Sequence, residues 1–168
     1  MHQRDEMKKK GSSLNIPTRK TYRLKDYDYS TAGAYFITIC SKERQCCFSD
    51  IIPFDGDLPP QVVLSALGLI VEQAIMSIPQ HYQNVSVDNY VIMPNHLHLL
   101  ISLNEKNTQT ISRMIQQMKG FISKQYGTPV FQNKFYDHII RDAEDYKSRY
   151  EYIDDNPRRW SEDDYFMP

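Results

Sequence analysis

Two histidines separated by a single residue stand inside an apolar run. His96 and His98 lie in HLHLLI, which is typical of a β-strand. Side chains alternate between the two faces of a strand, so both imidazoles point to the face opposite Leu97. Imidazoles about 7 Å apart along a strand can converge on one metal ion. We therefore expect His96 and His98 to be metal ligands outside the core; the alternative is that they form hydrogen bonds at its edge.

A tyrosine and an asparagine one helical turn apart form a second candidate group. Tyr152 and Asn156, in YIDDN, share one face of a predicted helix. An amide oxygen can be the third ligand of a hard cation, and the phenol would then lie beside it. Such a cation could also hold phosphate oxygens and polarise the phosphorus. The competing interpretation is that Tyr152 only packs, as most helical tyrosines do.

Other tyrosines on the same helix are better candidates for packing. Tyr146 and Tyr150 are four residues apart, and Ile153 continues their stripe. This spacing predicts that the stripe packs on a sheet. Tyr152 lies off that stripe and shares a polar face with Ser148, which separates it from the packing tyrosines.

Hydrophobic periodicity predicts the elements that position these residues. Strands are expected at residues 34–40, 85–93, 96–103 and 135–140. Two amphipathic helices are expected, one capped by Ser65 and ended by Pro79, the other running from Ile111 to near Gly127. Residues 50–60 are expected to be a loop because they hold three prolines and a glycine. A last helix begins after Asp142 and ends near Asn156, since Pro157 disfavours helical geometry before it.

The order of these elements predicts an α+β fold. Strand, helix, strand, strand, helix, strand is the ferredoxin-like split βαβ (βαββαβ) arrangement with an antiparallel sheet. Right-handed crossovers place both long helices on one face, and the extra C-terminal helix carries the tyrosine. We expect an N-terminal arm (1–33), one domain (34–160) and a short acidic tail (161–168), whose SEDD run does not resemble a DNA-binding feature.

Charge is unevenly distributed in this 168-residue chain of net charge −1. Residues 1–33 hold eight Lys/Arg against four Asp/Glu, a net of +4, and residues 142–168 hold four against nine, a net of −5. The basic arm is interleaved with tyrosines, which suits a nucleic-acid strand, though a solvated tail has the same composition. Its candidate DNA-binding residues are Arg19, Lys20, Arg23 and Lys25.

Cysteine content and hydropathy set the expected environment. Three cysteines without a CxxC pair predict neither a zinc site nor a disulfide framework. Since no apolar run approaches the length of a membrane span, we expect a reduced, cytoplasmic protein with no membrane partner.

Three motifs taken together resemble a known family. They are MPNHLHLLI at 93–101, FYDHIIRD at 135–142 and YIDDNPRRW at 152–160. In this order they are similar to REP-associated tyrosine transposases, a branch of the single-tyrosine transposases among the His-hydrophobe-His (HUH) endonucleases. The stretch at 19–39 also looks like the N-terminal section of that family, so the resemblance covers residues 19–160.

The resemblance implies a ferredoxin-like enzyme that nicks and rejoins single-stranded DNA near hairpins, through a covalent 5′-phosphotyrosine. It implies Tyr152 as the nucleophile, His96 and His98 as ligands of Mg²⁺ or Mn²⁺, and a polar ligand at Asn156. Its implied partner is single-stranded or hairpin DNA, such as repetitive palindromic elements, and the protein would join the nucleoid when bound. A homodimer is left open.

The sequence also offers three further candidate residues and three alternative functions. Lys119, His138 and Arg141 are weaker candidates for DNA binding or for support of the site, because a structural role is the more typical one for His138 and a solvated side chain for Lys119 and Arg141. A histidine-triad nucleotide hydrolase would need a third histidine where Leu100 stands. Two amphipathic helices argue against an all-β metal oxygenase. A hairpin-binding descendant of a transposase that no longer cuts DNA stays open.

Overall fold

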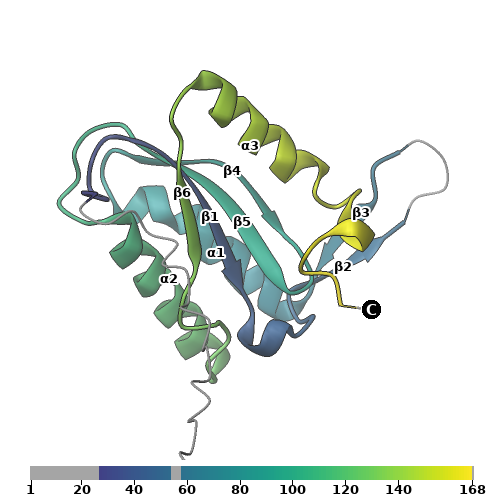
Figure 1. The fold of residues 1–168 in the computed structure, drawn as a ribbon. Coiled ribbons are helices and arrows are strands. Elements are labelled where there is room, and N and C mark those ends of the chain that lie inside the picture. Colours follow the sequence, from purple (N-terminus) through teal and green to yellow (C-terminus); the bar gives the residue numbers. More distant parts are fainter. Residues whose placement is uncertain (1–26, 54–57, 168) are drawn as a thin grey trace, which may run out of the picture.

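A computed structural model describes residues 27–53 and 58–167 of the chain. The strands of its main sheet are β1 (Gly33–Cys40), β4 (Val85–Ile92), β5 (His96–Leu103) and β6 (Tyr136–Ile139). They lie in the order β4-β5-β1-β6 with antiparallel neighbours. Helix α1 (Ala66–His81) precedes β4, and α2 (Ile111–Tyr126) connects β5 to β6. This βαββαβ order confirms the ferredoxin-like fold class (Figure 1).

The central strand β5 separates two different packing layers. Leu97 and Leu99 belong to the main core, which α1 and α2 cover on one face of the sheet. Leu100 belongs to a smaller cluster on the opposite face, where it meets Ile153 of the last helix. This alternation, with a period of two residues, sends His98 to the smaller cluster's side, as predicted.

The two covering helices begin as predicted, but α1 does not end at its proline. The Ser65 hydroxyl accepts from the backbone N–H of Gly68 at 3.0 Å and caps α1. Pro79 lies inside the helix, which continues to His81. A proline lacks only its own N–H, and the N–H of Tyr82 still donates to the carbonyl of Ile78 at 3.1 Å. The prediction that Pro79 ends the helix is therefore wrong.

The first residues of the segment expected to be a loop, 50–52, belong instead to the first strand of a hairpin. Strands β2 (Ser49–Ile52) and β3 (Gln61–Leu64) pair antiparallel as a separate two-stranded sheet. The prolines all lie outside these strands, so they do not interrupt the ladder. The residue just before β2 lies close to the start of α1: a Cβ on Gly68 would lie 2.0 Å from the carbonyl oxygen of Phe48.

Helix α3 (Ala143–Asp155) covers the sheet face opposite α1 and α2. Its N-cap is Asp142, whose side chain accepts from the N–H of Asp145 at 2.8 Å, and its C-cap is Asn156; both were predicted. A 3-10 turn at Trp160–Glu162 follows and leads the chain back toward the start of β5. Across the described ranges, no helix combines the length and apolar character needed to cross a bilayer.

Candidate metal centre and nucleophile

His96 and His98 lie side by side beneath α3 and the segment that follows it. Their ring centroids are 4.7 Å apart, so the prediction that both point to one face is confirmed. The expectation that neither is part of the interior is wrong: their exposed fractions are 0% and 2%. They are buried because Tyr152 and Tyr165 cover them, with ring centroids 5.2 Å from His98 and 4.6 Å from His96, respectively.

Three buried polar atoms at this place form no hydrogen bond. They are Nε2 of His96, Nε2 of His98 and Oδ1 of Asn156. Leaving such atoms unpaired in an interior costs roughly 1–3 kcal/mol each. One cation among them would satisfy all three at once, so these residues fit a metal ion. Imidazole nitrogen and amide oxygen are ligands that suit divalent ions such as Mn²⁺.

A carboxylate that was not predicted completes this group. Oδ2 of Asp163 lies 3.9 Å from Nε2 of His96, and its side chain is only 4% exposed. Ligand atoms of His96, His98 and Asp163 all lie within 4.8 Å of one another. Nδ2 of Asn156 donates to Oδ2 of Asp163 at 3.2 Å. The amide oxygen of Asn156 therefore points away from this hydrogen bond. A carboxylate also gives the set a negative charge, which favours a hard cation.

The hydrogen bonds of Asn95 determine the tautomer of His96. Nδ2 of Asn95 donates to the backbone carbonyls of Tyr165 at 2.7 Å and Arg44 at 3.3 Å. Oδ1 of Asn95 must then be the acceptor in its 2.9 Å contact with Nδ1 of His96. The proton of His96 therefore lies on Nδ1, and Nε2 keeps its lone pair facing the site. Nδ1 of His98 is bonded to the hydroxyl of Thr38 at 2.8 Å, which leaves Nε2 of that ring toward the site as well.

Burial also keeps both histidines neutral. It lowers the pKa of His96 to about 4 and holds the pKa of His98 well below its ordinary value. The negative charge of Asp163 opposes this effect at His96, while the neighbouring His96 adds to it at His98. Near neutral pH both rings are therefore uncharged, and the uncharged imidazole is the form that binds metal.

Tyr152 is placed directly against the candidate metal centre. Its ring lies edge-on to Phe36 at 5.9 Å and to His98 at 5.2 Å between centroids. Burial raises the pKa of the Tyr152 phenol, the charge of Asp163 raises it further, and the neighbouring amide of Asn156 opposes the rise. Without a bound cation the phenol therefore stays protonated, so a nucleophilic role requires positive charge nearby.

The prediction of which tyrosines of α3 pack on the sheet is only partly right. Ile153 is buried, and Tyr146 packs beside it as predicted. Tyr150 is 38% exposed, so the prediction that it packs on the sheet is wrong. The sheet-facing side of α3 also contains Tyr152 and Asn156.

Sequence reasoning missed the contribution of the C-terminal segment. Asp163 and Tyr165 reach the histidines, and the ring of Trp160 lies 5.9 Å from His96 between centroids. The N–H of Tyr165 donates to Oδ1 of Asp163 at 2.7 Å, which fixes this segment locally. No sequence signal separates Asp163 from its acidic neighbours, because the placement depends on how the chain folds back after α3.

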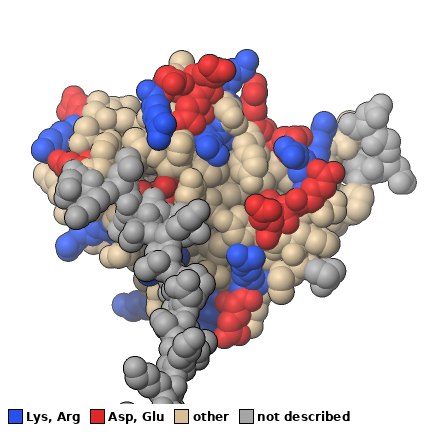
Figure 2. All heavy atoms as spheres, in the orientation of Figure 1, with Lys and Arg blue, Asp and Glu red and all other residues tan. Residues whose placement is uncertain are grey.

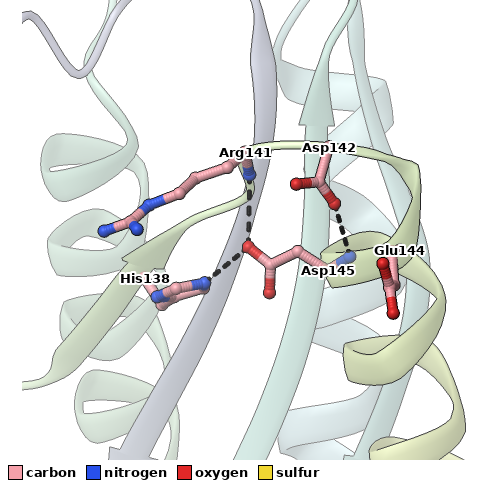
Figure 3. Close-up of a pocket in the computed structure, with 5 residues that line it drawn as sticks. All are labelled: His138, Arg141, Asp142, Glu144 and Asp145. Atoms are coloured by element: carbon pink, nitrogen blue, oxygen red, sulfur yellow. Dashed lines mark hydrogen bonds and ion pairs between the residues drawn. The ribbon is translucent and has the colours of Figure 1, made fainter.

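The other predicted residues lie apart from the histidines. His138 and Arg141 line a pocket of about 320 Å³ beside the N-terminus of α3 (Figure 3). There Nε2 of His138 is 2.7 Å from Oδ2 of Asp145. Lys119 is on α2, where Nζ donates to the carbonyls of Gln132 at 2.6 Å and Asn133 at 3.2 Å, and burial lowers its pKa. Its ammonium group therefore forms hydrogen bonds within the protein. The predicted arm residues Arg19, Lys20, Arg23 and Lys25 lie outside the described part of the chain.

Charge is mixed on the face that carries α3. Lysine and arginine side chains alternate with acidic ones over α3 and the C-terminal segment in Figure 2. Among the described residues visible there, no broad surface of one sign forms. Contacts with a polyanion on this face would therefore depend on individually placed cations.

Comparison with known proteins gives consistent matches. Residues 30–151 match the family model described as IS200-like transposase, a match that stops one residue before Tyr152. An uncharacterised protein of Haemophilus influenzae is 34% identical over 180 residues, which is 92% of this chain and 97% of that protein. The REP-associated tyrosine transposase of Escherichia coli K12 is 30% identical over 71 residues, 42% of this chain and 43% of that protein.

One solved structure shares the fold over most of the chain. It is a REP-associated tyrosine transposase bound to a REP hairpin, with a TM-score of 0.63 and 20% identity. The match covers 82% of this chain and 73% of that one. The likeness supports the arrangement of sheet and helices described above.

Proposed function

Because this chain belongs to the IS200-like transposase family, we propose that it nicks and rejoins single-stranded DNA with Tyr152 as nucleophile. The observation that carries the proposal is the group of three buried, unpaired ligand atoms, on His96, His98 and Asn156, with the Tyr152 ring beside them. Buried polar atoms in proteins are nearly always paired, so a bound cation gives these three the partner they lack.

The proposed cofactor is Mg²⁺ or Mn²⁺. His96 and His98 would hold it through Nε2, Asn156 through Oδ1 and Asp163 through Oδ2. When bound, it would supply Lewis-acid stabilisation of the charge that develops on the phosphate. Hard oxygen ligands and two imidazoles suit these ions, and Asp163 extends the predicted ligand set.

The chain's own residues would then perform a transesterification. The phenol oxygen of Tyr152 attacks the phosphorus and forms an O–P bond, while the bond from phosphorus to the 3′-oxygen breaks. The phenol proton passes to solvent, and the released 3′-oxygen takes up a proton to become a hydroxyl. Phe36 and His98, which stack on each other, both make edge contacts with the tyrosine ring, and these contacts would orient the attack. One phosphoester replaces another, so a 3′-hydroxyl can reverse the step.

Hairpin DNA is the proposed substrate class. The structural relative described above is bound to a REP hairpin. We propose that this chain likewise binds a DNA hairpin with a single-stranded flank and cleaves in the flank. A protein that binds the hairpin without cutting it would be the non-catalytic alternative.

The test uses a suicide oligonucleotide that carries a hairpin, incubated with the full chain and Mg²⁺ or Mn²⁺. Mass mapping of the DNA-linked peptide should place the attachment at Tyr152, and Tyr152→Phe should form no adduct. The matched control is Tyr150→Phe, on the exposed side of the same helix, which should react normally.

A second control addresses the other tyrosine near the histidines. Burial raises the pKa of Tyr165 to about 12, and its N–H and carbonyl hold the segment in place. We expect Tyr165→Phe to retain adduct formation. Attachment at Tyr165, Tyr150 or Tyr146, or an unchanged yield in Tyr152→Phe, would overturn the assignment. Hairpin binding with no adduct under either ion would favour the non-catalytic alternative.

A further inference from the structure

Arg149 stands on the same face of α3 as Tyr152. Arg149, Tyr152 and Asn156 follow the spacing of one helical stripe, which is turned toward the sheet. The guanidinium carbon of Arg149 lies 5.3 Å from the centroid of the Phe36 ring. His98 stacks on that same ring at 5.1 Å between centroids, and Tyr152 meets its edge at 5.9 Å. One aromatic side chain therefore contacts the guanidinium, a candidate metal ligand and the proposed nucleophile.

The inner edge of this guanidinium is held in place. Nε of Arg149 is 3.4 Å from Oδ1 of Asp145, one turn earlier on the helix. The other oxygen, Oδ2, is 2.7 Å from Nε2 of His138 and accepts from the N–H of Arg141 at 3.2 Å. Figure 3 shows His138 and the Arg141 backbone converging on this carboxylate. Asp145 is thus fixed from β6 and from the turn before α3, and it fixes Arg149 in turn.

The outer edge of the guanidinium is free to bind. Its terminal nitrogens make no hydrogen bond or ion pair with any residue in the ranges 27–53 and 58–167. The side chain is 33% exposed, so it is partly desolvated yet reachable. A planar guanidinium with one edge tied and the other open suits bidentate contact with phosphate oxygens. Because the surrounding surface carries both signs of charge, a single fixed cation such as Arg149 would contribute much of the attraction for a phosphate on this face.

We propose that Arg149 binds a backbone phosphate of the DNA strand beside Tyr152, and that His138 is a positioning residue that acts through Asp145. This inference rests on the proposed function, because the phosphate is that of its substrate. It gives His138 a role at a distance from the metal centre, with no contact to DNA.

The experiment compares Arg149→Gln with Lys147→Gln in the full chain. Lys147 lies on the same helix and is 75% exposed, and its substitution removes the same charge. The readouts are the salt dependence of affinity for a hairpin with a single-stranded flank, and the single-turnover rate of adduct formation with Mn²⁺. Arg149→Gln should lower the log–log salt slope by about 0.7 and the rate by about 100-fold. Lys147→Gln should change neither.

Further variants separate a phosphate contact of Arg149 from damage to the fold. Arg149→Lys should restore the salt slope but only part of the rate, because an ammonium cannot contact phosphate in two places. His138→Gln should slow the reaction in the parent and have no added effect in Arg149→Gln. Thermal unfolding of each variant detects damage to the fold; if Arg149→Gln unfolds, Arg149→Lys and His138→Gln decide the question.

The failure of this inference can be told apart from failure of the proposed function. If the parent forms adducts and Arg149→Gln keeps the parent's slope and rate, the role of Arg149 is wrong and the proposed function stands. If the parent binds the hairpin but forms no adduct, the salt slope still decides whether Arg149 contacts phosphate. A parent that does not bind DNA would overturn both.

Discussion

Oδ1 of Asn95 accepts a 2.9 Å hydrogen bond from Nδ1 of His96, and this bond leaves Nε2 of His96 as the nitrogen facing Asp163. The residue that precedes the first histidine therefore orients a ring of the candidate metal centre. Orienting partners of this kind contribute to metal affinity although they never touch the ion.

Replacing Asn95 with Leu should weaken Mn²⁺ binding by about 10–100-fold, because Nδ1 of His96 loses its acceptor and the ring no longer has one fixed tautomer. Calorimetric titration with Mn²⁺ measures the affinity. Imidazole ¹⁵N shifts of the metal-free protein report the tautomer directly. Asn133→Leu, at an exposed position, is the control. A pure Nδ1–H tautomer and parental affinity in Asn95→Leu would contradict the assignment.

Binding of Mn²⁺ should stabilise the protein against heat. At a free concentration 100 times the Kd the gain is about 2.7 kcal/mol, which for a domain of this size corresponds to roughly 5–11 °C in Tm. His98→Phe should abolish the gain while retaining a ring to stack on Phe36, and EDTA should reverse it in the parent. His81→Phe, at the exposed end of α1, should keep it. An equal gain in His98→Phe would show that the ion binds elsewhere.

Asp163→Asn should lower Mn²⁺ affinity by about tenfold or more, because the site loses its one negative ligand. The adjacent Asp164→Asn removes the same charge from an exposed position and should leave the affinity unchanged. Titration followed by electron paramagnetic resonance of Mn²⁺ measures both. Equal losses in the two variants would mean that Asp163 acts only through long-range charge.

Gly68→Ala should destabilise the fold by about 3 kcal/mol or more, since the new methyl group meets the Phe48 carbonyl at 2.0 Å and that atom is backbone. Gly120→Ala is the matched control: it lies in α2, and its Cβ meets nothing within 4 Å. There the change should stabilise the protein by about 0.5–1 kcal/mol. Urea unfolding monitored by circular dichroism measures both, and similar midpoints would show that the hairpin moves away at no cost.

The main sheet and its helices were predictable because each buries one face. The apolar alternation along β5 predicts its observed bounds, and the caps Ser65 and Asp142 stand where helices begin. Hairpin β2–β3 was not predictable, because its strands are short and mostly exposed and therefore lack a hydrophobic pattern. Prolines at its boundaries made the segment resemble a loop.

Only part of the candidate site follows from local sequence. The pair His96 and His98 can be read from strand alternation, and Asn156 from helical spacing with Tyr152. Asp163 cannot, because its approach to His96 depends on the turn after α3, which is a tertiary feature with no periodicity. The burial of the histidines was missed for the same reason: what covers them is a segment distant in sequence.

The position of Trp160 allows its fluorescence to report on the candidate metal centre. It is the only tryptophan of the sequence, and its ring centroid lies 5.9 Å from that of His96. Selective excitation of indole fluorescence therefore observes one place in the protein, and that place adjoins the metal ligands. A paramagnetic ion such as Mn²⁺ bound to His96 would quench this emission, whereas diamagnetic Mg²⁺ would leave it bright. Occupancy, exchange of one ion for another and arrival of a DNA base at the ring can each be followed in real time without a label.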